Sequence, residues 1–203
     1  MPATVRLGTC SWADEGLLKA WYPRGVSGAA ARLRYYAERF DVVEVDSPFY
    51  ALPDPDVSRR WAERTPDEFT FHVKAGAAMT FHEGEPTDAA FAAFRGSVEP
   101  LELSGKLRGV LLQYHPRFVK SAAAKAELAR ARGRLEPLVP LVEFRHRSWM
   151  EPDERGWYWS STPRSFPESA RGSTDERKAA NAASVGSPSC QVMAAPALTW
   201  NVK

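Results

Sequence analysis

The chain has 203 residues, which is enough for one large domain or two small ones with an adequate core. Lys and Arg total 27 against 25 Asp and Glu, with no block of like charge, and this balance argues against nucleic-acid binding. Only two cysteines occur, so we expect no disulfide framework. Residues 1–6 lack the apolar core of a signal peptide, and no run approaches the roughly 18 apolar residues of a membrane span. We therefore expect a cytoplasmic protein without membrane association.

Short apolar runs alternate with helical patterns from residue 5 to residue 149, which is typical of repeated βα units around a parallel sheet. Each run has the length of a strand, and each helical pattern ends near a Pro or Gly that returns the chain to the sheet. The predicted strands, in chain order, are residues 5–11, 41–46, 69–74, 109–113 and 138–146.

The predicted helices have apolar residues at intervals of three and four. In the first of them Leu33, Tyr36 and Phe40 share one face. Asp56 and Thr87 are predicted to cap the amino ends of two helices, because their side chains can accept hydrogen bonds from free backbone N–H groups. The predicted helices are residues 29–40, 56–64, 87–103 and 121–135.

The second and fifth predicted strands carry charge at alternate positions. Glu44 and Asp46 alternate with valines, and Glu143 and Arg145 alternate with Val142 and other apolar residues. Because strand side chains alternate in direction, the apolar residues can face covering helices while the charged residues face the opposite side together. These four charged residues are the candidate catalytic groups, and structural ion pairs inside a barrel are the alternative interpretation.

Several collinear blocks of sequence carry a resemblance to a known family. The longest are Val43-Glu44-Val45-Asp46-Ser47-Pro48-Phe49-Tyr50 and Val142-Glu143-Phe144-Arg145-His146, and shorter ones include Gly8-Thr9-Cys10-Ser11-Trp12 and Trp21-Tyr22-Pro23. Over roughly residues 5–150 the chain resembles the YecE-like proteins, the family catalogued as domain of unknown function 72. The resemblance implies a TIM-type β/α barrel, and the family itself has no assigned activity.

The resemblance stops near residue 154, although a full barrel of this family continues with three more βα units. We therefore expect residues 1–155 to form a partial TIM-type barrel, with about five of eight βα units, and residues 156–203 to form an irregular tail. The tail is rich in Ser, Ala, Pro and Arg, as a frameshifted reading of a GC-rich gene would be, and a natural linker is the alternative. An open five-stranded fragment is expected to self-associate through its two sheet edges.

Further polar and aromatic residues lie near the carboxyl ends of the predicted strands, where active sites of these barrels lie. Polar side chains there can bind a substrate, and aromatic rings can stack on a planar ligand, although aromatic residues near loops also serve as core. The candidate substrate-binding residues are Trp12, Tyr50, His72, Lys74, His82, Gln113 and His146.

Two classes of function follow from these residues. One is an acid/base, hydrolase-like enzyme that acts on a small polar or anionic substrate in a complete barrel, and the other is a non-catalytic barrel that binds such a ligand; an inactive fragment is a further alternative. Glu44, Asp46, His72 and Glu143 have the chemistry of metal ligands, but Lys74 and Arg145 oppose a cation and favour an anion such as phosphate or carboxylate. No metal is assigned, and the cofactor is unknown.

Overall fold

A computed structural model describes residues 5–151 of the chain. Five strands form one parallel sheet in the order β1-β2-β3-β4-β5, so the predicted α/β class and strand order are confirmed. Within this sheet β1 and β5 are the end strands, and self-association through them stays a prediction; the predicted tail lies outside the described residues. The strands are β1 (Gly8–Cys10), β2 (Val42–Val45), β3 (Thr70–Lys74), β4 (Leu107–Gln113) and β5 (Pro140–Glu143).

All four predicted helices are present, and a further short helix precedes them. This first helix was not predicted because it has no buried residue and so no apolar stripe. No helix within residues 5–151 is long and apolar enough to cross a membrane. The helices are α1 (Glu15–Ala20), α2 (Ala29–Ala37), α3 (Pro55–Glu63), α4 (Asp88–Leu103) and α5 (Ala122–Leu135), with 3-10 turns η1 (Ser47–Phe49), η2 (Ala77–Met79) and η3 (Arg147–Trp149).

One of the two predicted helix caps is confirmed and the other is wrong. Thr87 caps α4, where its side chain accepts a hydrogen bond from the backbone N–H of Ala90. The cap of α3 is Asp54 and not Asp56, because Pro55 already occupies the first helical position. The Asp54 carboxylate accepts the Asp56 N–H at 2.8 Å.

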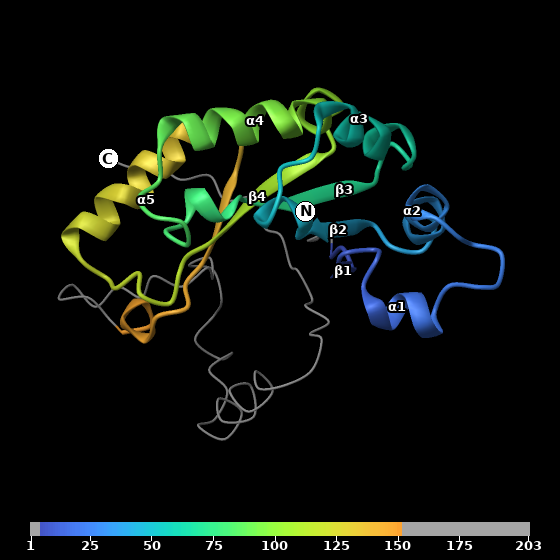
Figure 1. Cartoon of the computed structure of the whole chain (residues 1–203), viewed down its shortest axis with the longest axis horizontal. Coiled ribbons are helices and arrows are strands. Elements are labelled where there is room, and N and C mark those ends of the chain that lie inside the picture. The colour runs from blue at the N-terminus through green and yellow to red at the C-terminus, as the bar shows by residue number, and fades with distance from the viewer. Residues whose placement is uncertain (1–4, 152–203) are drawn as a thin grey trace, which may run out of the picture.

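Alternation along the strands produces one apolar face, and α3, α4 and α5 lie along the same side of the sheet (Figure 1). The residues of this face form one core with apolar side chains of the helices, and fully burying each large one contributes roughly 1.5–3 kcal/mol. The strand residues of this core include Val43, Val45, Phe71, Val73, Val110 and Leu112, and the helix residues include Leu33, Phe91, Phe94, Leu101 and Leu135.

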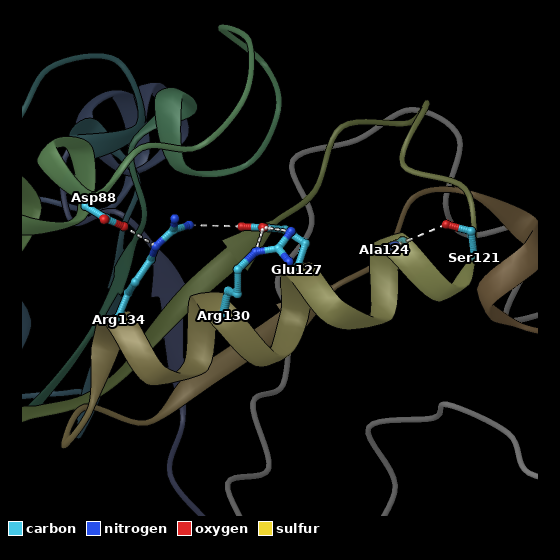
Figure 2. Close-up of polar contacts among 6 residues, drawn as sticks. All are labelled: Asp88, Ser121, Ala124, Glu127, Arg130 and Arg134. Carbon is cyan, nitrogen blue, oxygen red and sulfur yellow. Dashed lines mark hydrogen bonds and ion pairs between the residues drawn. The ribbon is translucent and has the colours of Figure 1, made fainter.

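A buried carboxylate on α5 joins the last two helices (Figure 2). Glu127 accepts hydrogen bonds from Arg130 Nε at 2.7 Å and from Arg134 Nη1 at 3.2 Å. Arg134 Nε also donates to Asp88 Oδ1, at the start of α4, at 2.6 Å. Because the Glu127 charge is paired on both oxygens, its burial is compensated, and Arg134 links α5 to the start of α4.

The strand boundaries differ most from the prediction at the end of β5 and at the start of β1. β5 ends at Glu143, so Arg145 and His146 lie beyond the strand and not within it. β1 begins at Gly8, where the sheet is unusually tight: a Cβ on Gly8 would lie 2.0 Å from the carbonyl oxygen of Val42. Only glycine therefore lets β1 approach β2 this closely.

Candidate functional site

The strand face opposite the helices carries polar side chains in register. Cys10 pairs with Glu44, Glu44 with His72, and His72 with Gly109 across β1 to β4. Side chains of paired residues point to the same face of a parallel sheet, so Cys10, Glu44 and His72 form one row. Val43 and Val45, on either side of Glu44 in the sequence, lie in the core on the other face of the sheet. The predicted separation of apolar and charged faces on β2 is therefore confirmed.

Gly109 completes this row by leaving room for its neighbours. A Cβ at this position would lie 2.7 Å from Leu141 Cδ1 and 3.4 Å from His72 Cδ2. The His72 imidazole thus lies against the bare backbone of β4. Its burial lowers the pKa of His72, since a charged ring would lose hydration there.

Glu44 is the most enclosed acid of the site. Its side chain is only 5% exposed, and Oε2 has no hydrogen-bond partner among residues 5–151. Burial raises the pKa of Glu44 to about 7, and the nearby carboxyl of Asp46 adds to this rise. Glu44 can therefore hold or release a proton near neutral pH.

Asp46 lies just beyond β2 and is compensated by a cation from the next strand. Lys74 Nζ, at the end of β3, lies 3.7 Å from Asp46 Oδ1. The same ammonium group lies 4.7 Å from the centre of the Phe49 ring, a favourable cation–π geometry. Lys74 thus compensates the charge of Asp46. The charge of Glu44 has no such ion pair within residues 5–151, and protonation can neutralise it.

Cys10 was not among the candidate residues, although on β1 it pairs with Glu44 of β2. Its thiol, Glu44 and Asp46 offer ligand atoms that all lie within 4.8 Å of one another, a spacing that could hold a cation. Burial, with the charges of the two acids, raises the pKa of Cys10 to about 12, so the thiol stays protonated. Lys74, beside Asp46, opposes a cation here, and we assign no metal.

The polar residues of β4 and β5 form a second group with different partners. Gln113 Nε2 donates to Glu143 Oε2 at 3.0 Å, and Arg145 Nε donates to Glu143 Oε1 at 2.8 Å. The Glu143 side chain is 34% exposed and that of Arg145 is 48% exposed. Both Glu143 oxygens therefore have a partner, and both residues also contact solvent.

The loops after β3 and β4 bring two histidines together. The rings of His82 and His115 lie 5.0 Å apart in an edge arrangement, and Phe49 contacts His82 at 4.9 Å. Burial lowers the pKa of His82, and so do the charges of His115, Arg145 and Lys74, in that order. His115 was not predicted; it lies two residues after Gln113, in the loop that follows β4.

The three remaining predicted residues have other surroundings. Trp12 is buried and packs edge-on against Trp61 at 5.5 Å, as a core residue does. Tyr50 is largely exposed and contacts the Phe49 ring. His146 caps η3, because its ring nitrogen Nδ1 accepts the backbone N–H of Ser148 at 3.2 Å.

Comparison with known proteins places the chain among proteins without an assigned activity. The family model described as protein of unknown function DUF72 matches residues 6–161. The UPF0759 protein YunF of Bacillus subtilis is 33% identical over 153 residues, which cover 73% of this chain and 53% of YunF. The UPF0759 protein YecE of Escherichia coli K12 is 38% identical over 65 residues, or 32% of this chain and 24% of YecE.

Solved structures show the same fold. A DUF72 family protein from Enterococcus faecalis V583 superimposes with a TM-score of 0.64 at 25% identity, over 73% of this chain and 54% of its own. A DUF72 family protein from Thermotoga maritima MSB8 gives a TM-score of 0.62 at 27% identity, over 73% of this chain and 58% of its own. These neighbours are TIM-barrel-like, and the chain spans about half the length of YunF and of both neighbours.

Proposed function

This chain belongs to the family of proteins of unknown function DUF72, and from that premise we propose that its strand-end residues carry out acid/base chemistry on a small polar or anionic substrate in a complete barrel. Glu44 is the proton-transfer group. Its partners are Asp46, which keeps the Glu44 pKa high, and Lys74, which compensates Asp46.

The burial of Glu44 beside the Asp46 carboxyl is the observation that carries the proposal. A general acid or base works best when its pKa lies near the operating pH, and Glu44 has a pKa of about 7 because it is buried beside another carboxyl. Its Oε2 atom is buried and has no hydrogen-bond partner within residues 5–151, so no donor stabilises a negative charge on this oxygen. Structural carboxylates such as Glu127 instead have both oxygens paired.

Glu143 and Arg145 have a different part in this proposal. The Glu143–Arg145 pair is held by Gln113 and reaches solvent, so Arg145 can turn a face to a polar or anionic substrate while Glu143 fixes its position. A non-catalytic ligand-binding barrel remains the second candidate, and it is favoured by the full pairing of Glu143.

A substrate screen with matched variants tests the proposal. The protein, Glu44→Gln and Glu143→Gln are assayed on chromogenic esters, glycosides and phosphate monoesters between pH 5 and pH 9. We expect turnover with a limb near pH 7 that falls at least about a hundredfold in Glu44→Gln. Turnover and a pH profile that survive Glu44→Gln would overturn the role of Glu44, and saturable binding without turnover would favour the ligand-binding barrel.

A further inference from the structure

We infer that Lys74, His82, His115 and Arg145 form a subsite for a phosphoryl group, either inorganic phosphate or a phosphate monoester of a small molecule. The inference deepens the proposed function, and rests on it for the claim that the bound group belongs to a substrate. Anion binding itself depends only on these four residues, so it can be tested separately.

The four groups come from the carboxyl ends of three neighbouring strands. Lys74 is the last residue of β3, and His82 follows in the loop after η2. His115 and Arg145 each lie two residues beyond the end of their strand, β4 and β5. Because parallel strands end at one edge of the sheet, groups far apart in sequence meet there.

Direct contacts hold three of the groups in a continuous series. Lys74 Nζ lies against the Phe49 ring, Phe49 lies against His82, and His82 lies against His115. Arg145 joins this series through its charge alone: after burial, the charges of His115, Arg145 and Lys74 lower the pKa of His82, in that order. A bound anion would relieve this mutual repulsion.

The hydrogen bonds of the two histidines leave ring nitrogens for a ligand. His115 Nδ1 accepts the backbone N–H of Arg117 at 3.1 Å, so the neutral ring carries its proton on Nε2, a donor. Thr80 Oγ1 lies 3.0 Å from His82 Nδ1 and occupies that nitrogen, which leaves Nε2 of His82 for a ligand. His82 then becomes a second Nε2 donor when it binds a proton.

Two acids compete with an anion at this subsite. Asp46 lies 3.7 Å from Lys74, and Glu143 lies 2.8 Å from Arg145. A carboxylate ligand would add little to cations that already have carboxylate partners. A doubly charged oxyanion with several acceptor atoms can bridge the two histidines and Lys74 together, and this favours a phosphoryl group over a carboxylate.

Proton NMR of the histidine ring signals in the full chain tests the subsite. Inorganic phosphate, phenyl phosphate and acetate are titrated separately at constant ionic strength, at pH 6 and at pH 8. We expect saturable shifts of the His82 and His115 signals with both phosphate probes, tighter at pH 6, and little change with acetate. Tighter binding of phenyl phosphate than of inorganic phosphate would identify the group as part of a substrate, and the reverse would identify free phosphate.

Variants separate the subsite from general charge and from the proposed function. His115→Asn and His82→Gln are expected to weaken phosphate binding at least about tenfold, whereas Lys19→Gln, which removes an exposed cation on α1, is expected to leave it unchanged. Unshifted His82 and His115 signals in the unmodified chain, or an equal loss in Lys19→Gln, would overturn the subsite. A Glu44 pKa near 7 measured on the same sample, with no phosphate binding, would reject the subsite alone.

Discussion

Two glutamates on the same face of the sheet, Glu44 on β2 and Glu143 on β5, have opposite environments. Glu44 is 5% exposed with one oxygen unpartnered within the described residues, whereas Glu143 is 34% exposed by its side chain and both its oxygens accept hydrogen bonds. The difference arises from the neighbours: Cys10 and Asp46 flank Glu44, and Gln113 and Arg145 flank Glu143. The same residue type on the same face of the sheet thus gives the proposed proton-transfer group at Glu44 and a fixed ion pair at Glu143.

The largest change should follow from separating β1 from β2, which would expose Glu44. Gly8→Ala places a Cβ 2.0 Å from the Val42 carbonyl oxygen, so the strands must move apart, and we expect a loss of about 3 kcal/mol in the free energy of unfolding. Chemical denaturation measures this loss. Gly96→Ala, at an exposed position of α4 with no atom within 4 Å, is the control and should stabilise by about 0.5–1 kcal/mol. Equal effects in the two variants would mean that β1 does not pack this closely.

Removing the Glu44 charge should stabilise the protein at high pH. The folded pKa of about 7 exceeds the ordinary value of 4.5, so the folded state holds a proton that the unfolded state releases. Stability is therefore full below pH 4.5 and falls as the pH rises to 7, by up to about 3 kcal/mol. At pH 8 Glu44→Gln should recover about 2 kcal/mol of this loss. The recovery is incomplete because the buried amide also loses hydration. At pH 4 the substitution should recover nothing. Denaturation midpoints at the two pH values measure the effect, and a destabilised variant at pH 8 would contradict it.

Glu143→Gln should have a smaller effect of the opposite sign. The pair that it breaks is partly exposed, so we expect a loss of about 1 kcal/mol or less in the free energy of unfolding. A stabilised Glu143→Gln variant at pH 8 would show that the two glutamates are alike and that the comparison fails.

The smallest expected effect concerns the cation that compensates Asp46. The charge of Lys74 lowers the pKa of Glu44, as the last of its causes, so Lys74→Met should raise this pKa further, by less than about one pH unit. The pH dependence of stability would then extend to higher pH by the same amount. Arg34→Met, which removes a cation of α2, is the control. A fall in the Glu44 pKa in Lys74→Met would contradict the arrangement.

The layered fold could be predicted from the sequence because alternation is a local property. Val43 and Val45 on one face and Glu44 on the other follow from the period of a strand, and so do the boundaries of most elements to within a few residues. The cap of α3 was misassigned to Asp56 because two acids flank Pro55, and only the position of the proline selects Asp54.

The partners of the charged residues could not be predicted, because they depend on strand register and depth. Both candidate pairs contain an acid two residues from another charged group, yet the sequence does not show that Lys74 reaches Asp46 or that Cys10 lies beside Glu44. His115 was missed because it follows β4 in a loop, where alternation no longer fixes direction. Such contacts are set by tertiary packing.

The most direct test of the account is the titration of the Glu44 carboxyl by carbon NMR, with the signal assigned by its absence in Glu44→Gln. The account predicts a midpoint near pH 7 for Glu44, as its burial beside Asp46 requires. A Glu44 midpoint near the ordinary value of 4.5 would show that the carboxyl is ionised and solvated at neutral pH, and would contradict its role in proton transfer.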